Sequence, residues 1–162
     1  KREQFCRIVE IGISDLARSV ALVEVAQRYA GGKTVLFTGI DLFEARSAER
    51  TPLSLKTAYR ALHATGAKVR LAPGVPGTSL AAAANAHQNT DLVLVSTSVP
   101  DSELEPAWFY VPRMLHARSE VFRETVGADE EPTFIRVAAS EIAERAGKEA
   151  ATPSRGPRRR AA

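Results

Sequence analysis

Two acidic residues in the first quarter of the chain stand where a carboxylate can bind a nucleotide-like ligand. Glu10 lies two residues before Gly12, near the end of the apolar run 5–11, and Asp41 closes a second apolar run. A glycine directly after a buried strand lets the chain turn sharply and lets a ligand approach the backbone, because glycine has no Cβ. A carboxylate at a strand end can accept both hydroxyls of a ribose. The pattern therefore indicates a nucleotide-type site.

The residues after Gly12 are typical of the start of a helix. Ser14 or Asp15 can cap it, and apolar residues then recur at helical spacing over 16–29. The free N–H groups of a helix start attract an anionic or polar ligand group. Strand, glycine turn and helix together therefore form the entry to the predicted site.

Strand-like and helix-like patterns alternate along the rest of the chain. We expect strands at 5–11, 34–41, 68–71, 91–96, 121–126 and 134–137, and helices capped by Thr51, by Thr78 or Ser79, by Ser102 and by Ser140. Pro112 should kink or break the fourth helix. The alternation predicts an α/β fold: a three-layer α/β/α sandwich with a mainly parallel, doubly wound sheet of order 3-2-1-4-5. The short connection before the last strand predicts an antiparallel edge strand.

Length and charge predict one domain and a tail. The 162 residues suffice for a single full core. We expect residues 1–150 to form the α/β domain, and residues 151–162, which hold prolines and arginines but no core residue, to be a disordered basic tail. Four arginines lie in the last eight residues, so the net charge of +3 is largely a property of this tail. Nucleic-acid binding would be possible only through this tail, and a solvated, flexible end is the interpretation we prefer.

Composition argues against several other classes of protein. No apolar run approaches the roughly 20 residues of a membrane helix. The lone Cys6 cannot form an internal disulfide, which favours a reducing, cytoplasmic location, and we expect it to be buried in the first strand. His63, His87 and His116 have no cysteine or acid at ligand spacing, so no metal site is expected.

We expect two of these histidines, and part of a run of aromatic residues, to serve the structure and not a binding site. We expect His63 on a helix surface and His116 near a helix C-terminus, where it would interact with the helix dipole. Trp108, Phe109 and Tyr110 are consecutive. They therefore cannot all face one core, and one or two should pack on the sheet.

Three segments are similar to the class I S-adenosylmethionine-dependent methyltransferases. They are 9–14 (VEIGIS), 38–41 (TGID) and 91–95 (DLVLV). That family carries an acid two residues before the first glycine of its loop, a second acid at the end of its second strand, and a comparable fourth strand. The resemblance covers about 5–137 in topology and implies S-adenosylmethionine as the cofactor. It implies a methyl-transferring enzyme whose acceptor and catalytic residues are unknown.

The resemblance also implies where the cofactor would bind. Asp41 would accept the ribose hydroxyls, and Glu10 would meet the ammonium group directly or through water. The turn after the third strand would border the adenine, and Ser96 would face the reacting methyl group. The implied positions are Glu10, Gly12, Ser14, Asp41, Leu42, Pro73, Gly74 and Ser96.

Departures from the family pattern leave alternatives open. The family's loop usually has three glycines, whereas Ser14 and Leu16 follow Gly12 here, and Leu16 would crowd the amino-acid end of the cofactor. A catalytically inactive binding or scaffold domain of this fold is one alternative, and a nicotinamide dinucleotide-binding protein is another. Against the second, Ser14 replaces the glycine needed for pyrophosphate approach. Glu10 could instead stabilise the loop, and Asp41 could cap the turn that follows it.

Overall fold

The structure, a computed structural model, describes residues 4–127 and 131–151. Its sheet has six strands in the order β3-β2-β1-β4-β5-β6; the first five are parallel, and β6 is antiparallel to β5. This confirms the predicted strand order and the antiparallel edge strand. The strands are β1 (Arg7–Ile11), β2 (Leu36–Asp41), β3 (Lys68–Pro73), β4 (Thr90–Val95), β5 (Leu115–Val126) and β6 (Pro132–Arg136).

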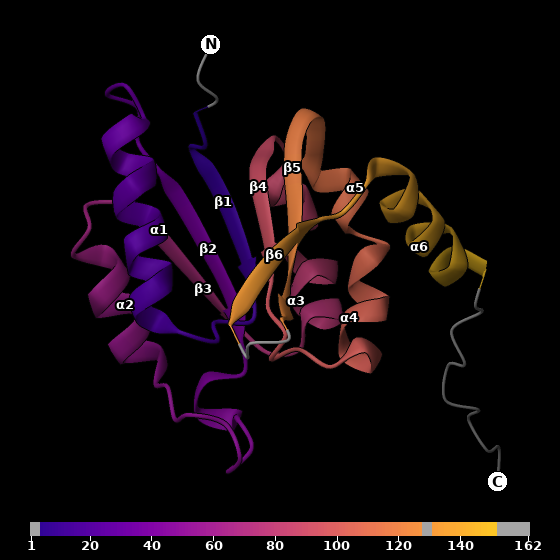
Figure 1. Ribbon diagram of the computed structural model, residues 1–162, viewed down its shortest axis with the longest axis horizontal. Coiled ribbons are helices and arrows are strands. Elements are labelled where there is room, and N and C mark those ends of the chain that lie inside the picture. Colours follow the sequence, from indigo (N-terminus) through magenta and orange to yellow (C-terminus); the bar gives the residue numbers. More distant parts are fainter. Residues whose placement is uncertain (1–3, 128–130, 152–162) are drawn as a thin grey trace, which may run out of the picture.

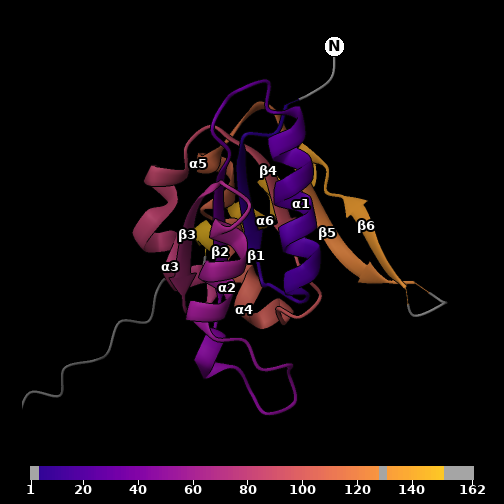
Figure 2. The same ribbon diagram turned by 90° about the vertical axis from the view of Figure 1, so that its left-hand side faces the viewer.

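Helices cover both faces of the sheet (Figure 1). On one face lie α1 (Leu16–Tyr29) and α2 (Leu55–His63), and on the other lie α3 (Pro76–Ala83), α4 (Asp101–Trp108), α5 (Val111–Met114) and α6 (Ala139–Ala151). Two short 3₁₀ turns, η1 (Phe43–Ala45) and η2 (Ala84–His87), follow β2 and α3. Figure 2 shows the β5–β6 hairpin projecting from the body beside α1.

Alternating strand residues build a separate core on each face. In β1, Ile8 packs with Phe37 and Leu62 under α1 and α2, whereas Val9 packs with Trp108 and other residues under the helices of the opposite face. Successive side chains of a strand point to opposite faces, so a buried parallel strand has to be apolar throughout. The near-continuous apolar run at the start of the chain reflects this requirement.

Several predicted helix starts are wrong, and local hydrogen bonds and prolines explain where the helices begin instead. The hydroxyl of Ser54, not of Thr51, accepts the N–H of Thr57 at 3.0 Å, so α2 begins at Leu55 and the loop after β2 is longer than expected. Pro76 opens α3 because its fixed φ suits the first helical turn, so neither Thr78 nor Ser79 is the cap.

The two later helices also begin before their predicted caps. Pro100 is the N-cap of α4 and makes no side-chain cap bond, so Ser102 lies inside the first turn. Ser140 likewise lies inside α6, which begins at Ala139. The predicted kink or break at Pro112 is confirmed, because α4 ends at Trp108 and Pro112 lies in the first turn of the separate helix α5, which begins at Val111.

Three further expectations concern Cys6, the aromatic run 108–110 and the C-terminal tail. Cys6 lies just before β1 and is half-buried rather than fully buried. Trp108 alone of the aromatic run is fully buried, whereas Phe109 and Tyr110 are half-buried. Helix α6 runs through Ala151, and the remainder of the predicted tail, 152–162, lies outside the described residues. No helix among the described residues is both long and apolar enough to cross a membrane.

Candidate functional site

The carboxyl ends of the parallel strands bring the predicted residues together at one edge of the sheet. The N–H of Gly12 donates to the Ile40 carbonyl at 2.7 Å, and the N–H of Ser96 donates to the Ile11 carbonyl at 2.9 Å. Next to them, the N–H of Gly74 donates to the carbonyl of Asp41 at 2.9 Å. Turns after β1, β2, β3 and β4 are thus held side by side, where ligands bind in open α/β sheets.

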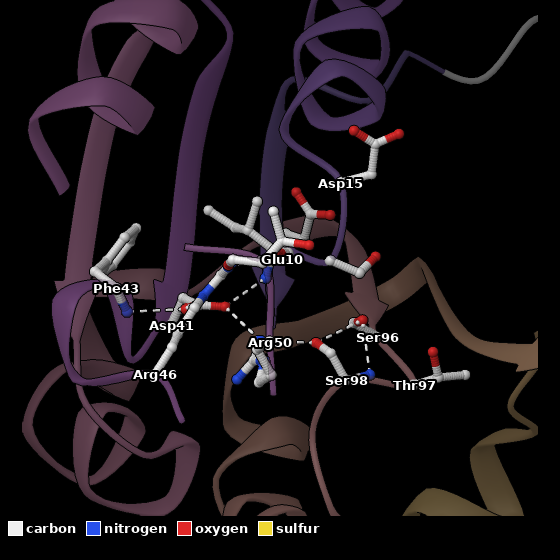
Figure 3. A network of polar contacts seen from close by, with 12 residues as sticks. Glu10, Asp15, Asp41, Phe43, Arg46, Arg50, Ser96, Thr97 and Ser98 are labelled. Carbon is white, nitrogen blue, oxygen red and sulfur yellow. Dashed lines mark hydrogen bonds and ion pairs between the residues drawn. The ribbon is translucent and has the colours of Figure 1, made fainter. Parts of the chain in front are cut away.

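Asp41 is the most heavily hydrogen-bonded of these residues (Figure 3). One carboxylate oxygen accepts the N–H of Phe43 at 2.9 Å and Nε of Arg46 at 2.7 Å. The other accepts the N–H of Ile13 at 2.9 Å and Arg50 at 3.2 Å. Burial by itself would raise the pKa of Asp41, but the hydrogen bonds from Arg46, Phe43 and Ile13 outweigh it and hold the pKa below its usual range. The carboxylate is therefore ionised.

Both arginines come from the long loop between β2 and α2, at the bottom of the view in Figure 1. The Arg46 side chain is only 5 % exposed, and its guanidinium also donates to the carbonyls of Ile13 and Thr51. Arg50 is more exposed and also donates to the Ser98 hydroxyl at 3.0 Å. We did not predict either arginine as a site residue. The signal in the sequence is two arginines within nine residues of a strand-end acid, in a polar loop.

The loop that follows β4 covers the Gly12 turn. Gly12 has φ +82°, a conformation that favours glycine, and a Cβ built there would lie 2.5 Å from Cγ2 of Val99. Val99 is itself buried. Its side chain therefore occupies the space through which a ligand would approach the turn.

Glu10 is fully buried near the start of α1. Its Oε1 lies 3.7 Å from the Arg18 guanidinium, and its Oε2 has no hydrogen-bond partner among the described residues. Burial raises the pKa of Glu10 to about 7, and the hydrogen bond from Ser19 and the charge of Arg18 only partly offset that rise. Glu10 therefore carries a proton for part of the time near neutral pH.

A second buried glutamate, which the sequence analysis missed, completes the polar network. Glu124 of β5 is 4 % exposed and binds the guanidinium of Arg18. It also accepts the hydroxyls of Ser96 at 2.9 Å and Ser14 at 3.3 Å, and the N–H of Thr97 at 3.2 Å. Burial tends to raise its pKa, but the hydrogen bonds from Arg18 and Ser96 lower it overall. No local pattern distinguishes Glu124, because only the sheet order brings β5 beside β4.

The remaining predicted residues lie around this network. Leu42 is half-buried, and its carbonyl accepts the N–H of Ala45 at 2.9 Å, which begins η1. Pro73 is exposed opposite Asp41 at the end of β3. Leu16 packs beside Phe43 rather than standing free in the cleft.

The histidines do not join the site. His116 belongs to β5, not to a helix end as expected, and its Nε2 lies 3.0 Å from a carboxylate oxygen of Asp91. His63 stacks on Tyr59 along α2. Within the described part of the chain, no three histidine, cysteine or acidic residues are grouped so that they could hold a metal ion.

In this arrangement the edge does not accommodate S-adenosylmethionine. A ribose would compete with four donors already bound to Asp41, and a methionine moiety over Gly12 would meet Val99. The Asp41 carboxylate, the Gly12 turn and Ser96 nevertheless lie together at this edge of the sheet. Binding therefore requires the 42–54 loop and the loop after β4 to move.

Comparison with solved structures defines the fold. A TehB-like S-adenosylmethionine-dependent methyltransferase from Corynebacterium glutamicum is 13 % identical with a TM-score of 0.52, covering 91 % of this chain and 66 % of that one. A Nostoc punctiforme protein assigned as an O-methyltransferase is 15 % identical with a TM-score of 0.51, covering 88 % of this chain and 45 % of that one. No protein-family model and no curated protein matches the sequence. The chain has the class I methyltransferase fold and spans less than two thirds of these neighbours.

Proposed function

We propose that the chain binds S-adenosylmethionine at the carboxyl edge of the sheet when Arg50 has left Asp41 and the loop after β4 has moved Val99 away from Gly12. The observation that carries this proposal is a buried, ionised carboxylate at the end of β2, one strand away from the Gly12 turn, in a fold shared with S-adenosylmethionine-dependent methyltransferases. Arg50 is the donor most easily displaced: its bond to Asp41 is the longest of the four, at 3.2 Å, and its side chain is 22 % exposed.

The proposal includes transfer of the methyl group to an acceptor of unknown identity. A direct displacement of this kind depends mainly on holding the two reactants in position, so it needs no dedicated base. We assign no described residue to that step, because the arrangement around Asp41 and Gly12 leaves no place for the reactants.

A second candidate function is a binding domain that uses this fold without a cofactor. It is favoured by Arg46, whose side chain is 5 % exposed and bridges Asp41 to the backbone at Ile13 and Thr51. A guanidinium with these partners holds the loop after β2 against the sheet, and this role needs no cofactor. A nicotinamide dinucleotide has less support, because Ser14 stands where that class of site needs a glycine for the pyrophosphate to approach.

Arg50→Ala is expected to strengthen the binding of S-adenosylmethionine about fivefold. The substitution removes a competitor for one oxygen of Asp41, and an ion pair whose arginine is partly exposed contributes about 1 kcal/mol. Isothermal titration calorimetry with S-adenosylmethionine and with its demethylated product measures the effect.

Arg60→Ala, which removes an exposed arginine of α2, is the matched control and should leave the affinity unchanged. Circular dichroism of each variant verifies the fold. If neither the wild-type protein nor Arg50→Ala binds either ligand at millimolar concentration, the cofactor proposal is wrong and the cofactor-free domain replaces it.

A further inference from the structure

A hollow lies at the opposite, amino-terminal edge of the sheet from the candidate site. Helix α3 has only eight residues, about 12 Å of helix, and the chain then turns away through η2. The amino ends of β1, β2 and β3 are therefore left uncovered on that face. They enclose a cavity of about 310 Å³, which the side of η2 completes.

Strand register places three cations around this hollow. One row across β1, β2 and β3 consists of Arg7, Leu36 and Lys68. In the row above it, Thr38 of β2 lies beside Arg70 of β3. Adjacent strands are about 4.8 Å apart, so the backbones of Arg7 and Lys68 are separated by about 10 Å. Leu36 and Thr38 thus form a floor between the cations.

The side chains of these three cations form no ion pair with a residue that the structure describes. Among the described residues that line the hollow there is no carboxylate. The guanidinium of Arg7 donates to the carbonyl of Gln88 at 2.9 Å, a neutral partner, whereas the backbone N–H of Arg7 donates to the Asp91 carboxylate at 2.7 Å. The positive field of the hollow is therefore available to a ligand.

The buried His87 in the wall responds to the same field. Its side chain is nearly covered, and its Nε2 has no hydrogen-bond partner among the described residues. Burial lowers the pKa of His87, and the charges of Arg70 and Arg7 lower it further. A field that disfavours a proton on His87 favours an anion beside it.

We propose that this hollow binds a small phosphate monoester. A phosphate dianion matches three cations that come from two strands, Arg7 from β1 and Lys68 and Arg70 from β3. Leu36, Val9 and Ala86 offer apolar contact to the organic part of the ligand. The volume is at the lower end of the range for small-molecule sites, and the concave shape suits a compact ligand better than an extended polymer.

Phenyl phosphate tests the proposal, because it combines the dianion with an apolar ring. We expect saturable binding to the full chain at submillimolar to millimolar concentration, with NMR shift changes at Thr38 and His87. Arg70→Gln and Lys68→Gln should each weaken binding about tenfold, the expected loss for one charge-assisted hydrogen bond. Both side chains are exposed on the edge strand β3, so thermal melting should be unchanged.

Arg60→Gln is the matched control, because Arg60 is an exposed cation of α2 on the other face. It should bind phenyl phosphate like the wild-type protein. The proposal is overturned if no saturable binding occurs up to 10 mM ligand, or if Arg60→Gln weakens binding as much as Arg70→Gln does. It is also overturned if a single-stranded RNA oligonucleotide binds more tightly than phenyl phosphate and loses affinity in the same two variants, which would identify a nucleic-acid surface.

Discussion

Asp41→Asn is expected to lower the free energy of unfolding by about 3–5 kcal/mol, because it leaves a buried arginine without its counter-ion. The Arg46 side chain is 5 % exposed, and no other carboxylate among the described residues forms an ion pair with it. The asparagine amide would also direct an N–H group toward one of the four donors that now surround the carboxylate. Urea unfolding, followed by circular dichroism, measures the loss.

The control for this prediction is Asp101→Asn. Asp101 also pairs with an arginine, Arg123, but its side chain is 67 % exposed, so its loss should cost less than about 1 kcal/mol. Equal losses in the two variants would show that burial of the Asp41 pair does not matter. A double variant, Asp41→Asn with Arg46→Met, should recover part of the stability, because the uncompensated charge is then removed as well.

The same variant bears on the proposed function. If Asp41 binds the ribose hydroxyls, Asp41→Asn should also weaken S-adenosylmethionine by tenfold or more, since each hydrogen bond to a charged group contributes about 1.5–3 kcal/mol. Calorimetry below the unfolding transition separates the two effects. A large loss of stability with unchanged affinity would restrict Asp41 to the structural role of holding Arg46 and the turn at Phe43.

Glu10→Gln is expected to remove a pH dependence of about 3 kcal/mol from the free energy of unfolding. The pKa of Glu10 rises from 4.5 to about 7 in the folded protein, and each pKa unit corresponds to about 1.4 kcal/mol. Between these values the folded chain holds a proton that the unfolded chain has lost. The contribution of Glu10 is therefore fully present below about pH 4.5 and is lost as the pH rises toward 7.

The measurement is the stability of the variant minus that of the wild-type protein, from urea unfolding between pH 4.5 and 8. Glutamine does not titrate, so this difference should rise in favour of Glu10→Gln by about 3 kcal/mol across the range. Asp41 and Glu124 have lowered pKa values, so their contributions change in the opposite direction, being lost as the pH falls. In the folded protein both residues titrate below the measured range, because their pKa values lie under the ordinary 3.8 and 4.5.

Glu24→Gln, an exposed position of α1, supplies the control and should show no such trend. A flat difference for Glu10→Gln would mean that Glu10 is ionised in the folded protein throughout this range. The charge of Arg18, 3.7 Å away, would then compensate for burial more fully than we infer.

Local patterns in the sequence were sufficient to predict the sheet and the position of its carboxyl edge. Apolar runs separated by helical segments imply parallel strands with right-handed crossovers, and this restricts the order to one that places Gly12, Asp41, Gly74 and Ser96 at one edge. The antiparallel edge strand followed from a connection too short to hold a helix. These features depend on the order of consecutive strands and helices and on the lengths of their connections, and the sequence shows both.

The partners of those residues were decided by contacts between distant segments. The Ser54 cap delays α2 and frees a loop long enough to bring Arg46 and Arg50 back onto Asp41. Glu124 meets Ser96 only because β5 pairs with β4. Neither contact leaves a periodic signal in the sequence, because each depends on which loops and strands pack side by side. Whether the edge opens to a ligand is likewise a property of the tertiary structure, since side chains of the protein already occupy it.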